Sequence, residues 1–218
     1  MRVKVVQDLI CPWCYIGHRN LEEAIREWTA TNDAPVEVEW LPYQLDPIAP
    51  GELQQGFHER FVERKGIGPD QIGTMFDRVV QAGASVGIAF RFDRITVAVD
   101  TMPGHIAIAA APAVKQGALV NALHRAYFEE GRDIGAPADI HAATRSAGLD
   151  ADEAATVMAA LANDAARAQV EANIQAIREA GVTGVPYFVI DDRLGLSGGQ
   201  PVEVFRQAFD QAADPALV

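Results

Sequence analysis

The chain has 218 residues, of which 49% are hydrophobic and 22% are charged, values close to the averages for globular proteins that fold in water. This length suits one principal core with room for a sizeable insertion, and it is short for two independent domains. Acidic residues outnumber basic residues by 30 to 18, which gives a formal net charge of −12. Because that charge has the wrong sign for neutralising phosphates or coating an anionic membrane, nucleic acids and membranes are excluded as expected partners.

The beginning of the chain predicts a strand rather than a targeting signal. Arg2, Lys4 and Asp8 interrupt the apolar residues before Cys11, so no secretory signal fits this segment. The longest weakly polar run, residues 106–114, is much shorter than the ~20 residues that a membrane-crossing helix needs. We therefore expect a cytoplasmic protein without a transmembrane helix.

The first elements predicted along the chain are a strand, a helix and a second strand. A β-branched run at residues 3–6 predicts a buried strand that ends before Cys11. Apolar residues then recur with the spacing of one helical face at Leu21, Ala24, Ile25 and Trp28. Residues 36–40 alternate apolar with acidic side chains, as in a strand with one buried face. Such a unit is expected to pair its strands in parallel through a right-handed connection.

A long helical region is predicted from about residue 51 to residue 181. Short glycine and proline interruptions divide it, and alanine is dense in residues 106–126 and 151–180, which favours helices that approach one another closely. Residues 90–100 are an exception, because their aromatic and β-branched side chains predict extended chain. The last helix of the region is expected to end at Gly181, a residue suited to the turn after a helix.

Strand patterns return after the helical region. Residues 187–190 and 194–197 predict a hairpin. A closing helix follows, and Pro201 suits its first position because proline there gives up no helical hydrogen bond. The order of elements predicts an α/β fold that carries a large all-helical insertion.

The two cysteines of the chain, Cys11 and Cys14, are its most informative feature. If a helix begins near Pro12, both cysteines lie on its first turn, within the Cα separation of ~4.4–6.8 Å that a disulfide requires. The unpaired N–H groups and the positive end of the helix dipole favour a thiolate at Cys11. Cys14 shares the apolar helix face of Leu21 and is expected to be a buried thiol. Cys11 is therefore the predicted nucleophile and Cys14 the resolving cysteine.

Two other uses of the cysteine pair compete with this one. A metal site would need further ligands, but the chain has no second cysteine pair and only His18 follows closely, so no metal is expected. Two inert core cysteines are the other alternative. Pro12 and Trp13 between them fit a helix start better than the interior of a strand.

Three separate segments carry a family resemblance. Residues 8–17 read Asp-Leu-Ile-Cys-Pro-Trp-Cys-Tyr-Ile-Gly, residues 180–190 contain Gly-Val-Pro-Tyr-Phe, and residues 197–201 read Ser-Gly-Gly-Gln-Pro. They resemble, in this order, the active-site segment, the cis-proline loop and a third segment of the DsbA family, in particular its cytoplasmic FrnE-like branch. Further similarity occurs at residues 124–128, 131–134 and 147–150.

The resemblance implies a thioredoxin-like fold with a helical domain inserted between its two halves. This is the order of elements that the residue patterns predict. We expect residues 1–50 and 181–218 to form one discontinuous thioredoxin-like domain. Residues 51–180 are expected to form the helical insertion, whose last helix leads back into that domain.

The resemblance also implies the chemistry. Cys11 and Cys14 would form a redox-active disulfide, and Pro186 would follow a cis peptide bond that leaves the Val185 backbone free to pair with an extended substrate. Pro12 and Trp13 would join these two residues in contacting substrate. The expected substrates are thiols or disulfides, either proteins or small molecules, with no bound cofactor and with glutathione as a candidate co-substrate. The direction of exchange depends on the reduction potential of the pair.

Two rival functions remain open at this stage. Similar insertion-bearing folds include glutathione-dependent isomerases and transferases of the hydroxychromene-carboxylate and kappa types, which commonly have serine where this chain has Cys11. A non-catalytic, redox-sensing binding module is the second rival. The presence of both cysteines and of the segment around Pro186 favours the thiol–disulfide oxidoreductase.

The five histidines receive no catalytic role from the sequence. Relatives usually have Asn-Thr or Asn-Ser before the histidine of the insertion, whereas this chain has Asp-Thr-Met-Pro-Gly before His105, so no role is carried over to that residue. The others are expected to be solvated or to pack against neighbours: His18, His58, His124 and His141.

Overall fold

The computed structural model describes residues 1–48, 55–66 and 68–214. A four-stranded sheet of order β2-β1-β3-β4 is its centre. β1 (Arg2–Gln7) pairs in parallel with β2 (Glu37–Pro42), as the sequence predicts. β3 (Tyr187–Ile190) runs antiparallel to β1 and forms the predicted hairpin with β4 (Leu194–Ser197).

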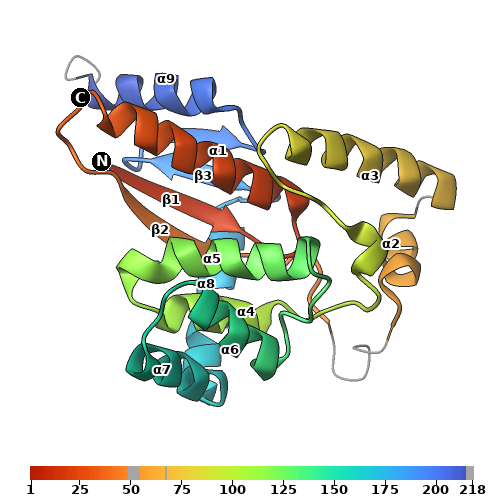
Figure 1. Ribbon diagram of the computed structural model, residues 1–218. Helices are drawn as coiled ribbons and strands as arrows, with labels where there is room; N and C mark the ends of the chain where they lie inside the picture. Colours follow the sequence, from red (N-terminus) through yellow and green to blue (C-terminus); the bar gives the residue numbers. More distant parts are fainter. Residues whose placement is uncertain (49–54, 67, 215–218) are drawn as a thin grey trace.

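Two long helices cover one face of the sheet (Figure 1). α1 (Pro12–Thr29) and α9 (Val202–Ala213) contact each other there, and Trp28 Nε1 donates a hydrogen bond to Asp210 between them. Their apolar faces meet the inward side chains of the strands in one buried cluster that includes Val3, Val5, Phe188, Phe205 and Phe209. Alternate strand residues point to opposite faces, which is why Val3 and Val5 enter the same cluster.

The closing helix begins one residue later than expected. Pro201 is the residue that precedes α9 and has an extended backbone, with ψ of 158°. The prediction for Gly181 is confirmed, because Gly181 follows the end of the last inserted helix with a φ of 87°. Few residues other than glycine adopt that conformation at low cost.

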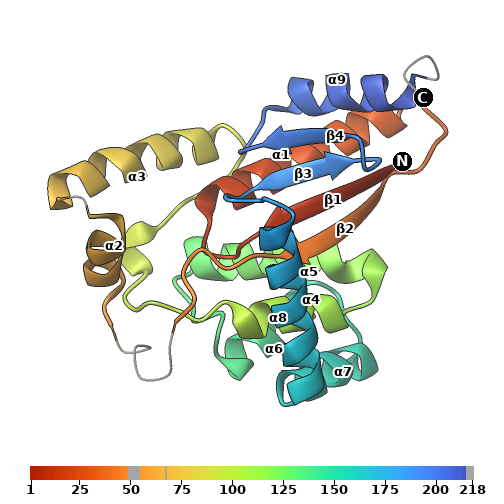
Figure 2. The same ribbon diagram turned by 180° about the vertical axis from the view of Figure 1, so that it is seen from behind.

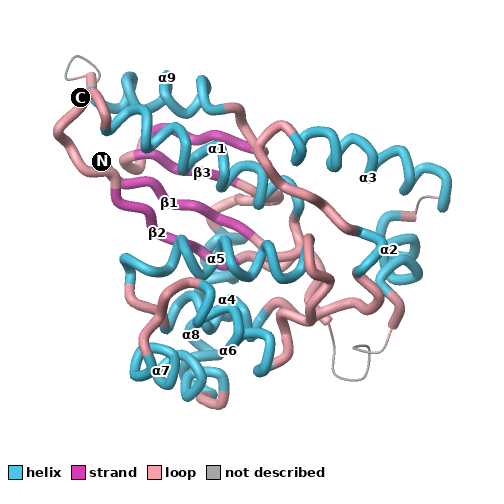
Figure 3. The backbone as a smooth tube through the Cα atoms, viewed as in Figure 1, coloured by secondary structure: helices cyan, strands magenta, loops and turns pink. Residues whose placement is uncertain are grey.

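The chain between β2 and β3 is helical, with loops between the helices (Figure 3). Its elements are α2 (Phe57–Lys65), α3 (Pro69–Ala84), the 3₁₀ helix η1 (Phe92–Arg94), α4 (Met102–Ala110), α5 (Ala113–Phe128), α6 (Pro137–Ser146), α7 (Ala151–Leu161) and α8 (Asp164–Glu179). The prediction of extended chain at residues 90–100 is therefore wrong for residues 92–94, where a backbone N–H bond from Arg94 to the Arg91 oxygen closes a turn. The expected boundary between residues 50 and 51 lies outside the described residues.

The inserted helices lie in two groups. Helices α4 to α8 pack beside the β2 edge of the sheet, while α2 and α3 stand apart, near the start of α1 (Figures 1 and 2). The largest apolar cluster of the described chain joins the insertion to the start of the thioredoxin-like part. Leu9, Tyr15 and Ile16 pack into the same cluster as Leu123 and Phe128 of the insertion. This shared core ties the helical block to the segment that carries the cysteines.

Within the described part of the chain, no helix combines the length and the apolar character that a membrane crossing requires.

Candidate active site

Cys11 occupies the residue immediately before the first helix. Its backbone is extended, with φ of −93° and ψ of 110°, and Pro12 takes the first helical position. The Cys11 carbonyl accepts hydrogen bonds from the backbone N–H groups of Cys14 at 3.0 Å and of Tyr15 at 3.4 Å. The predicted helix start is confirmed, and it places one cysteine at the helix end and the other one turn inside it.

The two thiols are free and lie in different surroundings. Cys11 is 4% exposed and Cys14 is 2% exposed. Burial raises the pKa of the Cys14 thiol well above its ordinary value. The hydrogen bond with Cys11 and the charge of Cys11 act in the same direction, and a hydrogen bond with the Asp8 backbone opposes them. The expectation of a buried thiol at Cys14 is confirmed, and Cys14 holds its proton more strongly than a solvent-exposed cysteine.

The loop before β3 meets Cys11 directly. The Val185–Pro186 peptide bond is cis, and the Cys11 Sγ donates to the Val185 carbonyl oxygen at 3.5 Å. Gly17, in the second turn of α1, packs beneath this loop. A Cβ atom at Gly17 would lie 3.0 Å from Phe188 Cζ and 3.3 Å from Pro186 Cγ, so a side chain at this position would crowd both residues.

The segment after β4 also contacts the Val185–Pro186 loop and the start of α1. The Gly198 N–H donates to the Pro186 oxygen at 2.8 Å, and Asn20 Nδ2 donates to the Gln200 oxygen at 2.9 Å. A Cβ atom at Gly199 would lie 3.0 Å from the Trp13 carbonyl oxygen. Residues 8–17 are far in sequence from residues 180–190 and 197–201, and the fold brings these three segments of the family resemblance together at the start of α1.

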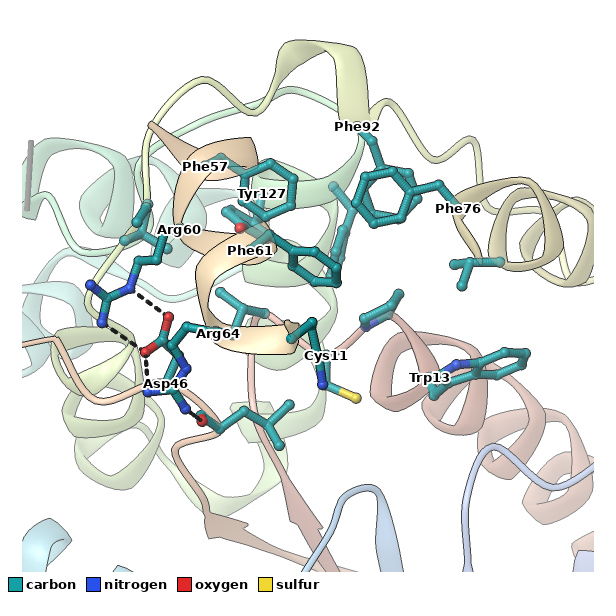
Figure 4. A pocket seen from close by; sticks show the side chains of 18 of the residues that line it. Cys11, Trp13, Asp46, Phe57, Arg60, Phe61, Arg64, Phe76, Phe92 and Tyr127 are labelled. Atoms are coloured by element: carbon teal, nitrogen blue, oxygen red, sulfur yellow. Dashed lines mark hydrogen bonds and ion pairs between the residues drawn. The ribbon is translucent and has the colours of Figure 1, made fainter. Parts of the chain in front are cut away.

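A pocket of about 380 Å³ opens beside Cys11 (Figure 4). All four residues that the sequence nominated for substrate contact lie at or near it: Pro12, Trp13 and Val185 line it, and Pro186 follows Val185. Trp13 is 41% exposed, which puts its ring at the rim. The volume falls within the range of ~300–1,000 Å³ typical of small-molecule sites.

Sequence reasoning missed the far wall of this pocket. α2 contributes Phe57, Arg60, Phe61 and Arg64, and the loop after β2 contributes Asp46. Arg60 donates to both Asp46 oxygens, at 2.6 and 2.8 Å. The spacing of phenylalanines and arginines at i and i+4 was a usable signal, because such pairs share one helix face. It indicated a two-sided helix, but nothing in it showed that this helix would face the cysteines.

A buried carboxylate lies close to the cysteine pair. Asp8 is fully buried, and its Oδ2 accepts a hydrogen bond from the Leu45 N–H at 2.7 Å. His105 Nε2 lies 3.3 Å from Asp8 Oδ1 and 3.0 Å from the Tyr43 oxygen. Neither residue has a role predicted from the sequence, although Asp8 stands three positions before Cys11.

Two other histidines, His18 and His124, are buried and pack against neighbours, which is one of the two roles expected for them. His18 packs against the Trp40 ring, and its Nε2 lies 3.2 Å from Glu22. His124 stacks on Tyr15 with ring centroids 5.0 Å apart, and neither ring nitrogen has a hydrogen-bond partner of ordinary geometry among the described residues. Burial lowers the pKa of His124 to about 3, the charges of His18 and His105 act in the same direction, and the Asp8 backbone opposes them.

No group of three or more histidine, cysteine or acidic side chains comes together as a metal site within residues 1–48, 55–66 and 68–214. His18, the one histidine that follows the cysteines closely, has its Nε2 directed to Glu22.

A helix-terminal cysteine pair beside a Val-Pro loop, on a four-stranded mixed sheet interrupted by a helical block, defines a thioredoxin-fold dithiol protein with a helical insertion. The family model of the DsbA-like thioredoxin domain matches residues 2–210. The chain belongs to this family of thiol–disulfide oxidoreductases.

Similar proteins cover nearly the whole chain. A probable DsbA oxidoreductase from Streptomyces coelicolor is 34% identical, with a TM-score of 0.83, over 97% of this chain and 89% of that one. The uncharacterized protein YwbO of Bacillus subtilis is 26% identical over 96% of each chain. The cytosolic disulfide reductase DsbM from Pseudomonas aeruginosa is 22% identical, with a TM-score of 0.67, over 97% of this chain and 98% of that one, a likeness that shows the fold alone.

Proposed function

We propose that the chain exchanges disulfides with its substrates through a dithiol and disulfide formed by Cys11 and Cys14. The Cys11 thiolate attacks one sulfur of a substrate disulfide, that S–S bond breaks, and one half leaves as a thiolate that takes up a proton. Cys14 then loses its proton and attacks Cys11, which breaks the mixed disulfide and releases the second half as a thiol. The substrate gains two electrons and two protons, and the enzyme is left oxidised. The reverse sequence oxidises a dithiol.

The asymmetry between the two thiols carries this proposal. Cys11 lies at the positive end of α1, contacts the Val185 carbonyl and lines the pocket. Cys14 lies one turn inside the helix, and its raised pKa keeps it protonated and unreactive toward other compounds in solution. A mixed disulfide on Cys11 brings a reactive sulfur to Cys14, which is the step a resolving cysteine has to perform.

The comparisons support the general chemistry. The family is one of thiol–disulfide oxidoreductases, and the DsbM neighbour is described as a cytosolic disulfide reductase that also binds GSH. We therefore extend the proposal to thiol and disulfide substrates, glutathione as a co-substrate, no bound cofactor, and a cytoplasmic location. Membership of the FrnE-like branch stays a prediction from the sequence.

Replacement of each cysteine by serine tests the proposal. In Cys14→Ser, the mixed disulfide on Cys11 has no internal thiol to resolve it, so intact-mass spectrometry should show a covalent adduct after challenge with oxidised glutathione or a protein disulfide. Cys11→Ser should show no adduct and no turnover. The wild-type protein should turn over with only transient adducts.

The same experiment separates the rival functions. A glutathione-dependent isomerase carries its reactive sulfur on glutathione, so Cys14→Ser would keep the wild-type rate and form no protein adduct. A sensing module would form the disulfide without repeated turnover. Either pattern would overturn the oxidoreductase proposal.

A further inference from the structure

The pocket beside Cys11 has a wall of aromatic rings. Phe76 and Phe92 stack with centroids 4.1 Å apart and an angle of 9° between their planes, and Phe61 lies 5.4 Å from Phe76. α2, α3 and η1 each contribute a ring, and Phe57 and Phe128 also line the space. Such a wall favours a flat apolar group, because ring faces and edges pack well against another ring.

The α2 end of the same pocket is cationic. Arg64 Nη1 lies 2.9 Å from Asp46 Oδ1, and its Nη2 donates to the Leu45 oxygen at 2.7 Å. Arg60 shares the same carboxylate. Lys65 lines the pocket without an ion pair to any residue that the structure describes. Asp46 is the only acidic side chain among the described lining residues, so cations exceed carboxylates there.

This local charge is opposite to that of the whole chain, which carries −12. Arg64 and Lys65 form the last turn of α2, where cations also complement the helix dipole. The interaction with the helix dipole does not depend on which side of the helix the cations occupy. Here both side chains line the pocket that contains Cys11 (Figure 4 labels Arg64, Asp46 and Cys11).

We infer that the pocket takes a small disulfide in which the reacting sulfur carries an aromatic group that bears a carboxylate. This inference rests on the proposed function and names its substrate class. The aromatic group lies against the phenylalanine wall and the carboxylate faces Arg64 and Lys65. Cys11 attacks the sulfur, the S–S bond breaks, the other half leaves as a thiol, and Cys14 then releases the bound half as a thiol while the enzyme becomes oxidised.

A set of small disulfides tests this assignment on the reduced protein. The probes are 5,5′-dithiobis(2-nitrobenzoate), which is aromatic and carboxylated, 4,4′-dithiodipyridine, which is aromatic and neutral, and dithiodiglycolate, which is carboxylated without a ring. Each rate constant, measured by stopped flow or by mass spectrometry, is divided by the rate constant of the same probe with N-acetylcysteine. This division removes the intrinsic reactivity of each disulfide.

The double variant Arg64→Gln/Lys65→Gln removes the cations, and Arg145→Gln/Arg167→Gln removes the same charge from α6 and α8. We expect the ratio of the nitrobenzoate rate to the dithiodipyridine rate to fall by about tenfold in the first variant and to stay at the wild-type value in the second. Arg64→Lys/Lys65→Arg should keep the wild-type ratio. An equal fall in both glutamine variants would mean that only the overall charge matters, which would overturn the inference.

Phe61→Ala tests the aromatic wall. It should slow both aromatic probes relative to dithiodiglycolate, and circular dichroism with a thermal melt checks that the variant is folded. Equal relative rates for all three probes with the wild-type protein would overturn the substrate class and leave the oxidoreductase proposal standing. Absence of any Cys11 adduct with any probe would instead overturn the proposed function.

Discussion

At the scale of single residues, the two cysteines differ by one helical turn and by their surroundings. Cys11 has the helix end and the Val185 carbonyl beside it, whereas Cys14 is enclosed among buried side chains and near the buried Asp8 carboxylate. A negative charge at Cys14 is penalised by desolvation and by the interaction with Cys11. The same four-residue motif therefore contains one sulfur suited to attack and one that stays protonated until a mixed disulfide forms.

Alkylation of the reduced protein tests this difference. We expect iodoacetamide to label Cys11 well before Cys14 at mildly acidic to neutral pH, because the raised pKa of Cys14 keeps it as a thiol throughout that range. Peptide mapping by mass spectrometry measures each site, and Cys11→Ser gives the labelling rate of Cys14 alone. Equal labelling of both sites across this pH range would contradict the assignment.

At the scale of elements, α1 is held against the Val185–Pro186 loop by close contacts that side chains would prevent. Gly17 allows α1 to approach Phe188 and Pro186, and Gly199 allows the next loop to approach Trp13. In the same region Cys11 at the start of α1 contacts the Val185 carbonyl. The glycines thus connect the packing of the elements with the geometry of the dithiol.

Replacing Gly17 by valine should push α1 away from β3 and the loop before it. We expect a loss of about 1–3 kcal/mol in the free energy of unfolding, the usual cost of overpacking, together with slower formation of the Cys11 adduct. Urea unfolding and adduct kinetics measure the two effects.

The matched control is Gly73→Ala, on the exposed part of α3, where a Cβ atom would meet nothing within 4 Å. Alanine there should be neutral or should stabilise the helix by roughly 0.5–1 kcal/mol, because glycine is a poor residue for a helix interior. A Gly17→Val variant as stable and as reactive as Gly73→Ala would show that this contact is not restrictive.

At the scale of the whole molecule, the helical insertion and the thioredoxin-like part share their largest apolar core. The stacked pair of Tyr15 from α1 and His124 from α5 lies in that shared core. Since the pKa of His124 is lowered from 6.5 to about 3, the folded protein holds this ring neutral. Protonation of the ring is therefore coupled to unfolding.

This coupling predicts a loss of stability in acid. Below pH 6.5 the unfolded chain binds a proton at His124 that the folded chain cannot bind until the pH nears 3. The contribution of neutral His124 to the free energy of unfolding is complete above pH 6.5. It declines as the pH falls, with a slope of up to about 1.4 kcal/mol per pH unit. Urea unfolding of the wild type and of His124→Phe between pH 7 and pH 4 measures it.

The phenylalanine variant keeps a ring against Tyr15 and removes the titrating group, so its stability should depend less on pH over this range. His141→Gln, on the exposed face of α6, serves as the control and should follow the wild type. Parallel pH curves for the wild type and His124→Phe would show that this histidine does not control the acid response.

The predictable part of the fold came from local patterns. Alternation at residues 36–40 and the helical spacing after Cys14 identified their elements because side-chain burial imposes periods of two and 3.6 residues. The turn at residues 92–94 was missed, since aromatic residues favour strands as a propensity and tertiary packing can override it. In this chain the rings of Phe90 and Phe92 pack into the shared core, and Phe92 also lines the pocket.

The site likewise has one part that the sequence predicts and another that depends on tertiary packing. The sequence by itself determined the dithiol, its place at a helix start and the Val185–Pro186 segment, because these depend on neighbouring residues or on recognisable motifs. Only the tertiary structure decided that Asp8 lies against His105 and that Arg64 of α2 lines the pocket of Cys11. Such pairs are dozens of residues apart, and their meeting depends on how whole helices pack around a shared core, which no local pattern specifies.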